Sequence, residues 1–297
     1  MAVAASELEK IIQEVLNELG KNGGNKKAVT EHAMSAVQAA RPAVGAFTEK
    51  MVSLIAADEI LVEHPVNLAA IKAMKKATTA RIGIGRAGAR PKTASWLKLL
   101  ADHAVAQDAV FVEVSEDFLQ RTNLFSVQSA AENKEQFLTR PDLGRRLSDE
   151  AVQTIRQKCE KDMQVQILIV DGLSSTAIEA NVPDILPALQ QGLKANGIKV
   201  GTPFFIKHGR VGVQDEVGQL LNAELVISLI GERPGLGTAE SLSAYIIYRP
   251  NEKTVEADRN VVSNIYKGGI PPAEAGAHLV DLIRQILSAK ASGVRFK

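Results

Sequence analysis

The stretch Leu225–Ile230, with the sequence LVISLI, is followed without a spacer by Gly231–Gly237, with the sequence GERPGLG. A short apolar run that ends at a glycine-rich, charged loop is typical of a buried strand. In open α/β sheets, ligands bind at the carboxyl ends of such strands. We therefore expect the function of this chain to lie at the loop that begins with Gly231.

Segments with strand-like and helix-like patterns alternate from residue 80 onward. The expected strands are Ala80–Ile84, Ala109–Val114, Val165–Val170, Ile198–Val200, Leu225–Ile230 and Ala244–Tyr248, and the expected helices are Thr93–Ala106, Ser148–Lys161, Pro183–Asn196 and Pro272–Ala291. Such alternation is typical of a mostly parallel sheet with helices on both faces. The sequence therefore predicts an α/β, Rossmann-like domain over residues 80–297, preceded by a helical region over residues 26–79.

The first 25 residues form a separate segment. Six apolar side chains from Leu8 to Leu19 share one face of a predicted helix, Ser6 and Glu9 form a capping box at its start, and Gly20–Asn25 ends it. A helix this short is marginal alone, so its apolar face needs a partner surface. It could pack on its own domain, but the glycines favour a flexible tether, and the acidic polar face favours a protein partner.

Composition excludes several classes of protein. Thirty-five basic and 34 acidic side chains leave a net charge of +1, so no global field points to nucleic acid or to an anionic membrane. No apolar segment approaches the length of a membrane helix, and no secretory signal is recognisable. The single cysteine, Cys159, excludes an intrachain disulfide, and the five histidines show no metal-ligand spacing. We expect no metal site and no membrane span.

Gly83–Gly88 (GIGRAG) satisfies the GxGxxG pattern between a predicted strand and a predicted helix. The pattern supports an alternative function, an NAD(P)- or flavin-dependent oxidoreductase that uses Gly83, Gly85 and Gly88, with Glu113 on the ribose. Arg90 and Pro91 argue against it, because they stand where the phosphate-binding helix should begin.

Four further features lie at predicted strand ends or in loops. Asp171 and the hydroxyls of Asp171–Thr176 either cap the next helix or form hydrogen bonds to a ligand edge. Glu232 follows a buried strand, where a carboxylate needs either an arginine partner or ligand amides. Val211, beside Gly212, could cover a large flat ring. Val255–Val261 alternates charged and apolar residues, which indicates either a salt-bridged loop or a third wall of one crevice.

Five motifs, two of them not yet described, together resemble a known family. They are Thr139–Arg146 (TRPDLGRR), Asp171–Ser174 (DGLS), Gly201–Phe205 (GTPFF), Gly231–Gly237 and Val255–Arg259 (VEADR). In this order they closely resemble the small subunit of ethanolamine ammonia-lyase, from about Arg81 to the C-terminus. The resemblance implies a carbon–nitrogen lyase subunit of the bacterial cytosol.

The resemblance also implies a cofactor and partners. The family's small subunit binds adenosylcobalamin against a larger, barrel-shaped subunit that carries the substrate site, for radical deamination of ethanolamine to acetaldehyde and ammonia. The family's cobalamin contacts fall on Val211, Glu232 and Val261 of this chain, and at the last position the family has cysteine. We expect no complete set of catalytic residues on this chain, a hetero-oligomer of large–small pairs, and an N-terminal segment (residues 1–25) that directs the enzyme to the shell or sister enzymes of the ethanolamine-utilisation microcompartment.

Overall fold

The computed structural model describes residues 60–78 and 80–296. The predicted N-terminal helix and its linker, residues 1–25, lie outside the described residues, as does most of the predicted helical region. The chain divides into two compact units, Met1–Ala101 and Asp102–Lys297. The three-part division predicted from the sequence, into residues 1–25, 26–79 and 80–297, stays a prediction.

The described part of the first unit contains α3 (Leu68–Ala77), a two-residue hairpin of β1 (Arg86–Ala87) and β2 (Arg90–Pro91), and the start of α4 (Thr93–Phe111). The strand predicted over Ala80–Ile84 is wrong, because that segment has no regular structure. Gly83 and Gly85 both have positive φ, which breaks an extended chain, and Gly88 lies in the turn of the hairpin. The GxGxxG pattern therefore has neither the strand before it nor the helix directly after its third glycine.

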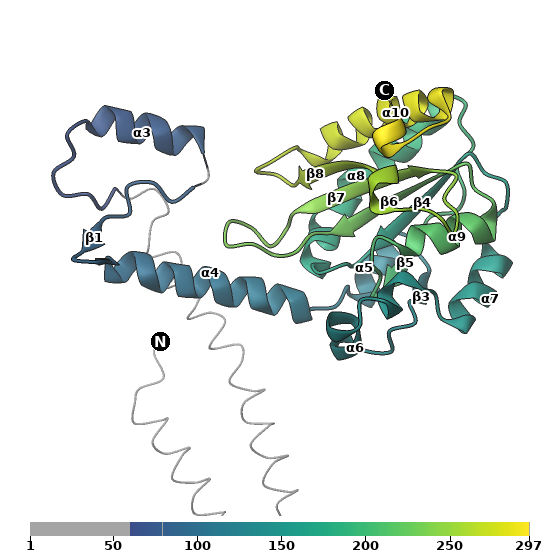
Figure 1. The fold of residues 1–297 in the computed structure, drawn as a ribbon, viewed down its shortest axis with the longest axis horizontal. Coiled ribbons are helices and arrows are strands. Elements are labelled where there is room, and N and C mark those ends of the chain that lie inside the picture. The colour runs from purple at the N-terminus through teal and green to yellow at the C-terminus, as the bar shows by residue number, and fades with distance from the viewer. Residues whose placement is uncertain (1–59, 79, 297) are drawn as a thin grey trace, which may run out of the picture. The chain divides into compact units, whose positions relative to one another are not determined.

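The second unit holds a six-stranded sheet, shown in Figure 1. Its order is β3 (Ser126–Gln128), β5 (Phe204–Lys207), β4 (Val165–Val170), β6 (Leu225–Gly231), β7 (Leu242–Tyr248) and β8 (Asn260–Ile265). Strands β3, β5, β4 and β6 are parallel, whereas β7 is antiparallel to both of its neighbours. Five of the six strands therefore run in one direction, which confirms the predicted α/β class with a mostly parallel sheet.

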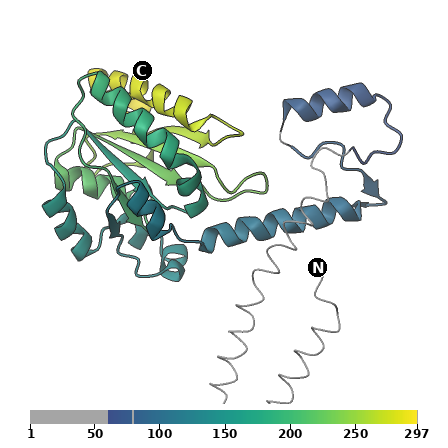
Figure 2. The ribbon, with the colours of Figure 1, turned by 180° about the vertical axis from the view of Figure 1, so that it is seen from behind.

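Helices cover both faces of the sheet because the central strands are apolar on both sides. Val165, Ile167 and Ile169 of β4 pack with α8 (Ser175–Ala195) and α10 (Pro272–Ala289), which lie side by side in Figure 2. Leu168 and Val170 instead pack with α7 (Asp149–Lys158) and α9 (Val213–Leu221). Strand residues point alternately to the two faces, so one strand contributes to two cores.

Shorter elements complete the unit. They are the helices α5 (Glu116–Arg121) and α6 (Lys134–Thr139) and the 3₁₀ turns η1 (Leu143–Arg145), η2 (Glu256–Asp258) and η3 (Gly293–Arg295). Edge strand β3, strand β8 and helix α9 were not expected from the sequence.

Two further predicted strands are wrong. Helix α4 continues to Phe111 through the expected strand Ala109–Val114, and it buries Ala106 and Ala109 one helical turn apart. The expected strand Ile198–Val200 contributes only an isolated bridge from Val200 to Val165, and the strand forms four residues later as β5. In both places β-branched residues suggested a strand, but tertiary packing favours a helix at the first and an irregular segment at the second.

The helix predicted to begin at Pro183 begins eight residues earlier. Ser174 caps α8 by accepting a hydrogen bond from the Ala177 N–H, and Pro183 and Pro187 lie inside the helix. An internal proline normally destabilises a helix by about 3 kcal/mol. Fully buried apolar residues on both sides of the prolines, including Ile178 and Leu189, supply the packing that offsets this cost.

Candidate functional site

The carboxyl ends of three central strands lie at one edge of the sheet. Since β4, β5 and β6 are mutually parallel, the turn Asp171–Ser174, the loop His208–Gly212 and the loop that begins at Gly231 all emerge at this edge. Ligands bind at this edge in open α/β sheets. Two of the three predicted contact residues, Val211 and Glu232, lie in these loops.

Val211 lies two residues before the start of α9 and is half-buried. Its side chain packs at the border of the core formed by α7, α9 and one face of the sheet. The loop is held on both sides of Val211, because the Arg210 N–H donates to the Gly144 carbonyl at 2.7 Å and the Gln214 N–H donates to the carbonyl of Val211 at 3.2 Å. The position is therefore fixed rather than loose.

Glu232 directly follows the last residue of β6 and is half-buried. Its Oε1 accepts hydrogen bonds from the Ser243 hydroxyl at 2.6 Å and from the Asn264 N–H at 2.9 Å. Among the residues that the structure describes, no arginine forms an ion pair with Glu232, so the arginine interpretation is wrong. The carboxylate is held by groups of the two antiparallel strands, β7 and β8.

Val261 lies on β8, and 47% of its surface is exposed. The strand register places it opposite Tyr245, which lies opposite Ser228 of β6. Directly opposed residues share a face of the sheet, and Ser243, the partner of Glu232, lies on that face two residues before Tyr245. The structure therefore brings Val261 and the hydrogen-bond partner of Glu232 onto the face against which Val211 packs.

Tyr245 is a site residue that the sequence argument missed. Its half-buried ring lies between Ser228 and Val261 in the register, and among the described residues no hydrogen bond reaches its hydroxyl. Burial raises the pKa of Tyr245, and the carboxylates of Glu232 and Glu256 raise it further. The alternation of β7, with Ser243, Tyr245 and Ile247 on one face, is the signal that could have found it.

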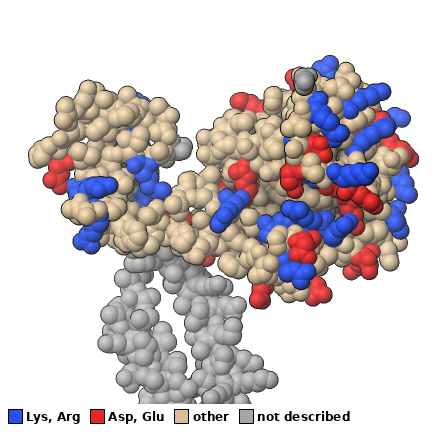
Figure 3. All heavy atoms as spheres, viewed as in Figure 1, with Lys and Arg blue, Asp and Glu red and all other residues tan. Residues whose placement is uncertain are grey.

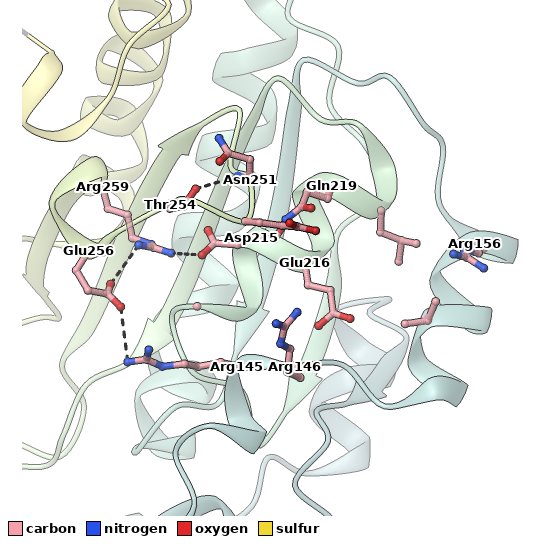
Figure 4. Close-up of a pocket in the computed structure, with 14 residues that line it drawn as sticks. Arg145, Arg146, Arg156, Asp215, Glu216, Gln219, Asn251, Thr254, Glu256 and Arg259 are labelled. Atoms are coloured by element: carbon pink, nitrogen blue, oxygen red, sulfur yellow. Dashed lines mark hydrogen bonds and ion pairs between the residues drawn. The ribbon is translucent and has the colours of Figure 1, made fainter.

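The segment Val255–Val261 is anchored by a buried arginine, shown in Figure 4. The Arg259 side chain is 2% exposed and forms ion pairs with Asp215 at 2.6 Å and with Glu256 at 3.2 Å. Burial raises the pKa of Asp215, and the Arg259 guanidinium partly offsets that effect. These bonds tie the start of β8 to α9, which confirms the salt-bridged interpretation of the segment.

A hollow of about 770 Å³ lies over α7, α9 and the 251–259 loop. Figure 4 shows its polar lining, in which arginines and acids alternate: Arg145, Arg146, Arg156, Asp215, Glu216, Glu256 and Arg259. Basic and acidic side chains also intermingle on the face of this unit seen in Figure 3. The hollow contains none of the three predicted contact residues, so the expectation that Val255–Val261 forms a third wall of their crevice is not met by this hollow.

The capping prediction for the turn after β4 is confirmed for a hydroxyl and is wrong for the Asp171 carboxylate. Ser174 caps α8, and the Asp171 carboxylate is 3% exposed. It accepts hydrogen bonds from the N–H groups of His208 at 2.7 Å and of Gly209 at 3.1 Å. Asp171 therefore neither caps the helix nor faces a ligand, but holds the loop that carries Val211.

No group of histidine, cysteine and acidic side chains suited to a metal ion occurs in the described part of the chain. Residues 60–78 and 80–296 also contain no helix that is both long and apolar enough to cross a membrane.

Glu113, predicted to lie at the end of a strand, instead lies two residues after the end of α4 and forms an ion pair with Lys207 at 2.9 Å. The oxidoreductase alternative therefore lacks the strand predicted before its glycine pattern and an acidic residue at the end of the following strand.

Comparison with known sequences decides the family. A sequence model described as the ethanolamine ammonia-lyase light chain matches residues 69–297. This chain belongs to the ethanolamine ammonia-lyase small-subunit family. The small subunit from Fusobacterium nucleatum is 48% identical over 296 residues, which cover 99% of each chain. The one from Clostridium perfringens is 52% identical over 239 residues, covering 80% of this chain and 81% of that protein.

Membership in the ethanolamine ammonia-lyase small-subunit family confirms the resemblance drawn from five sequence motifs. It also confirms that the chain is a subunit of an ammonia-lyase, an enzyme built from more than one kind of chain. All five motifs lie within the matched residues, and four of them border the carboxyl edge or the β8 segment described above.

Proposed function

We propose that this chain binds adenosylcobalamin together with the large subunit of ethanolamine ammonia-lyase, for the deamination of ethanolamine to acetaldehyde and ammonia. The observation that carries the proposal is the match of the light-chain family over residues 69–297. The parallel run of β3, β5, β4 and β6 supports it, because the edge at the carboxyl ends of parallel strands suits a large ligand.

The residues present fit a corrin, which has a broad apolar face and a rim of amide side chains. Val211, Val261 and the Tyr245 ring offer apolar surface on one side of the sheet. Glu232 offers a carboxylate acceptor, and the buried Ser241 hydroxyl beside it has no hydrogen-bond partner among the described residues. An open face of this kind suits a ligand that a second subunit covers from the other side.

Each of these side chains has a different task in binding. Glu232 accepts a hydrogen bond from an amide N–H of the ligand while Ser243 and Asn264 keep the carboxylate in place. Val211 and Val261 exclude water from the contact, and the valine at position 261 replaces a thiol contact with an apolar one. The radical chemistry comes from the bound cofactor, and the substrate groups come from the large subunit.

A binding titration tests the proposal. Adenosylcobalamin should show a bound-state absorption spectrum, and elute with protein, when this chain and the large subunit are mixed. Each chain alone should give a much smaller change, and NAD, NADP and FAD should show no binding. Binding of a dinucleotide by this chain alone, without corrinoid binding by the pair, would instead support the oxidoreductase alternative.

We also propose that residues 1–25 direct the enzyme to a bacterial microcompartment by binding either the shell of the compartment or other enzymes inside it. The support is the amphipathic pattern from Leu8 to Leu19 and the glycines after it. A fluorescent protein fused to residues 1–20 should co-localise with the shell, and the double change Ile12→Glu and Leu16→Glu should disperse it. A diffuse fusion in cells with intact shells would refute this role.

A further inference from the structure

The loop His208–Gly212, which carries Val211, has a backbone that its own sequence does not favour. His208 has a φ of +56°, in the left-handed region that non-glycine residues seldom adopt. Such a conformation persists only where surrounding groups hold it. The Ser129 hydroxyl donates to the His208 carbonyl at 2.7 Å, and Arg210 donates to the Phe137 carbonyl at 2.8 Å while its guanidinium lies over the Phe137 ring.

The strongest restraint on this loop is the Asp171 carboxylate. Its two oxygens accept from consecutive N–H groups, Oδ2 from His208 and Oδ1 from Gly209. A carboxylate that receives two backbone N–H groups holds both peptide planes in a fixed orientation. Asp171 is the first residue after β4, the strand that lies between β5 and β6, so this restraint comes from the centre of the sheet.

The same turn also contacts the second loop. The Leu173 N–H donates to the Gly231 carbonyl at 3.1 Å, directly before Glu232. Gly172 has a φ of +56°, and a Cβ there would collide with the Gly231 carbonyl oxygen. The turn Asp171–Leu173 therefore contacts both loops that carry predicted cofactor contacts, one through a carboxylate and the other through backbone.

The charged groups around Asp171 come from three directions. Lys134 of α6 and Arg210 attract its negative charge, and the Lys134 ammonium is buried with no hydrogen-bond partner among the described residues. His208 follows β5, and burial lowers its pKa, so its ring is neutral at pH 7. Glu113 faces Lys207 and His208 from the end of α4. Burial raises the pKa of Asp171 to about 6.

We propose that Asp171 is a positioning residue that fixes the relative placement of the His208–Gly212 loop and the Gly231–Glu232 loop, and thereby the affinity for the corrinoid. This inference rests on the proposed binding of adenosylcobalamin at Val211 and Glu232. Asp171 is buried beneath the two loops and acts through the backbone of His208 and Gly209.

Asp171→Asn tests the inference in the complex of this chain with the large subunit. The amide keeps the shape but presents one NH₂ group to a backbone N–H, so one restraint is lost. We expect the dissociation constant of adenosylcobalamin to rise about tenfold, while turnover at saturating cofactor stays within about twofold. Asp162→Asn is the matched control, because it removes the same charge before the amino end of β4, away from this edge, while its amide oxygen can still accept the hydrogen bond from Asn222.

The outcomes separate the inference from the proposed function. If the unaltered pair binds no corrinoid, the proposed function is wrong. If the unaltered pair binds it and Asp171→Asn binds it equally well, only the positioning role is wrong. A loss of folded complex with an unchanged dissociation constant would show that Asp171 serves stability alone.

A second measurement needs no variant. As the pH falls through about 6, protonation of Asp171 removes part of its acceptor capacity. Hydrogen exchange of the His208 and Gly209 amides, corrected for intrinsic rates, should then accelerate relative to amides of β6, and corrinoid affinity should fall in the same range. Constant protection of these two amides between pH 7.5 and 5.5 would overturn the inference.

Discussion

Two glycine-rich turns, Gly83–Gly88 and Gly231–Gly237, resemble binding loops in sequence, but they have different structural support. Gly231 ends a fully buried strand, and its carbonyl accepts a hydrogen bond from Leu173 in the turn that follows β4. Gly88 lies in a two-residue hairpin, and a Cβ added to it would meet no atom within 4 Å. A glycine pattern indicates a ligand site only where buried strands fix the loop.

Alanine substitution at Gly231 should lower the stability of the chain far more than alanine substitution in Gly83–Gly88. A Cβ at this position would collide with the carbonyl oxygens of Ser174 and Asp171, which are backbone atoms with little freedom to move. Gly231→Ala should lower the free energy of unfolding by about 3 kcal/mol. Chemical denaturation of the purified chain measures this, and a loss below about 0.5 kcal/mol would show that the edge is not tightly packed.

Removal of the Glu232 carboxylate should act on binding more than on folding. Glu232→Ala should weaken adenosylcobalamin binding by about 1 to 3 kcal/mol, because a buried amide donor of the ligand loses its acceptor. Ser243 and the Asn264 N–H also lose a partner, so a small drop in melting temperature should accompany the change. Unchanged affinity with a sharp fall in melting temperature would make Glu232 a structural residue, and Glu240→Ala serves as an exposed control.

Substitution in the first glycine-rich turn, Gly83–Gly88, should have only a small effect on stability and none on corrinoid binding. Gly88→Ala forces alanine to a φ of +65°, which costs about 1 kcal/mol, but it should leave corrinoid binding unchanged. Calorimetric titration with NAD, NADP and FAD should show no binding before or after the change. Micromolar binding that the substitution abolishes would revive the oxidoreductase alternative.

The smallest effect is expected at position 261. Val261→Cys introduces the residue that the family resemblance implies for this exposed position of β8. If the contact is apolar, the two side chains cover similar area and corrinoid affinity should change by less than about 0.5 kcal/mol. Val261→Asp, which places a charge in the same contact, should weaken affinity clearly. Equal affinity for the unaltered chain and for both variants would remove this position from the site.

Sequence patterns predicted the parts of the fold that burial dictates. Val165–Val170 and Leu225–Ile230 are strands because continuous apolar runs of that length suit a sheet covered on both faces. The errors at Ala109–Val114 and Ile198–Val200 arose where β-branched residues also suit helices or loops. The true start of α8 was hidden because Pro183 and Pro187 resemble helix starts, and only the packing around them reveals otherwise.

The site was predictable only in part. The position of Glu232 at a strand end followed from the sequence, but its partners on β7 and β8 did not, since Asn264 is 32 residues away. Asp171 bonds groups 37 and 38 residues later, and no local pattern encodes that distance. The placement of Tyr245 beside Val261 depends on the strand register, which a single sequence does not specify.

We propose that the corrinoid binds at the carboxyl edge of the sheet and against Tyr245 and the exposed Val261 on β7 and β8. The most direct measurement is an adenosylcobalamin titration, followed by absorption, of the large subunit mixed with the unaltered chain, with Glu232→Ala or with Gly88→Ala. We predict tight binding with the unaltered chain and with Gly88→Ala, and binding at least fivefold weaker with Glu232→Ala, following the loss of about 1 kcal/mol or more argued above. Equal affinity for all three, or a loss confined to Gly88→Ala, would contradict the claim.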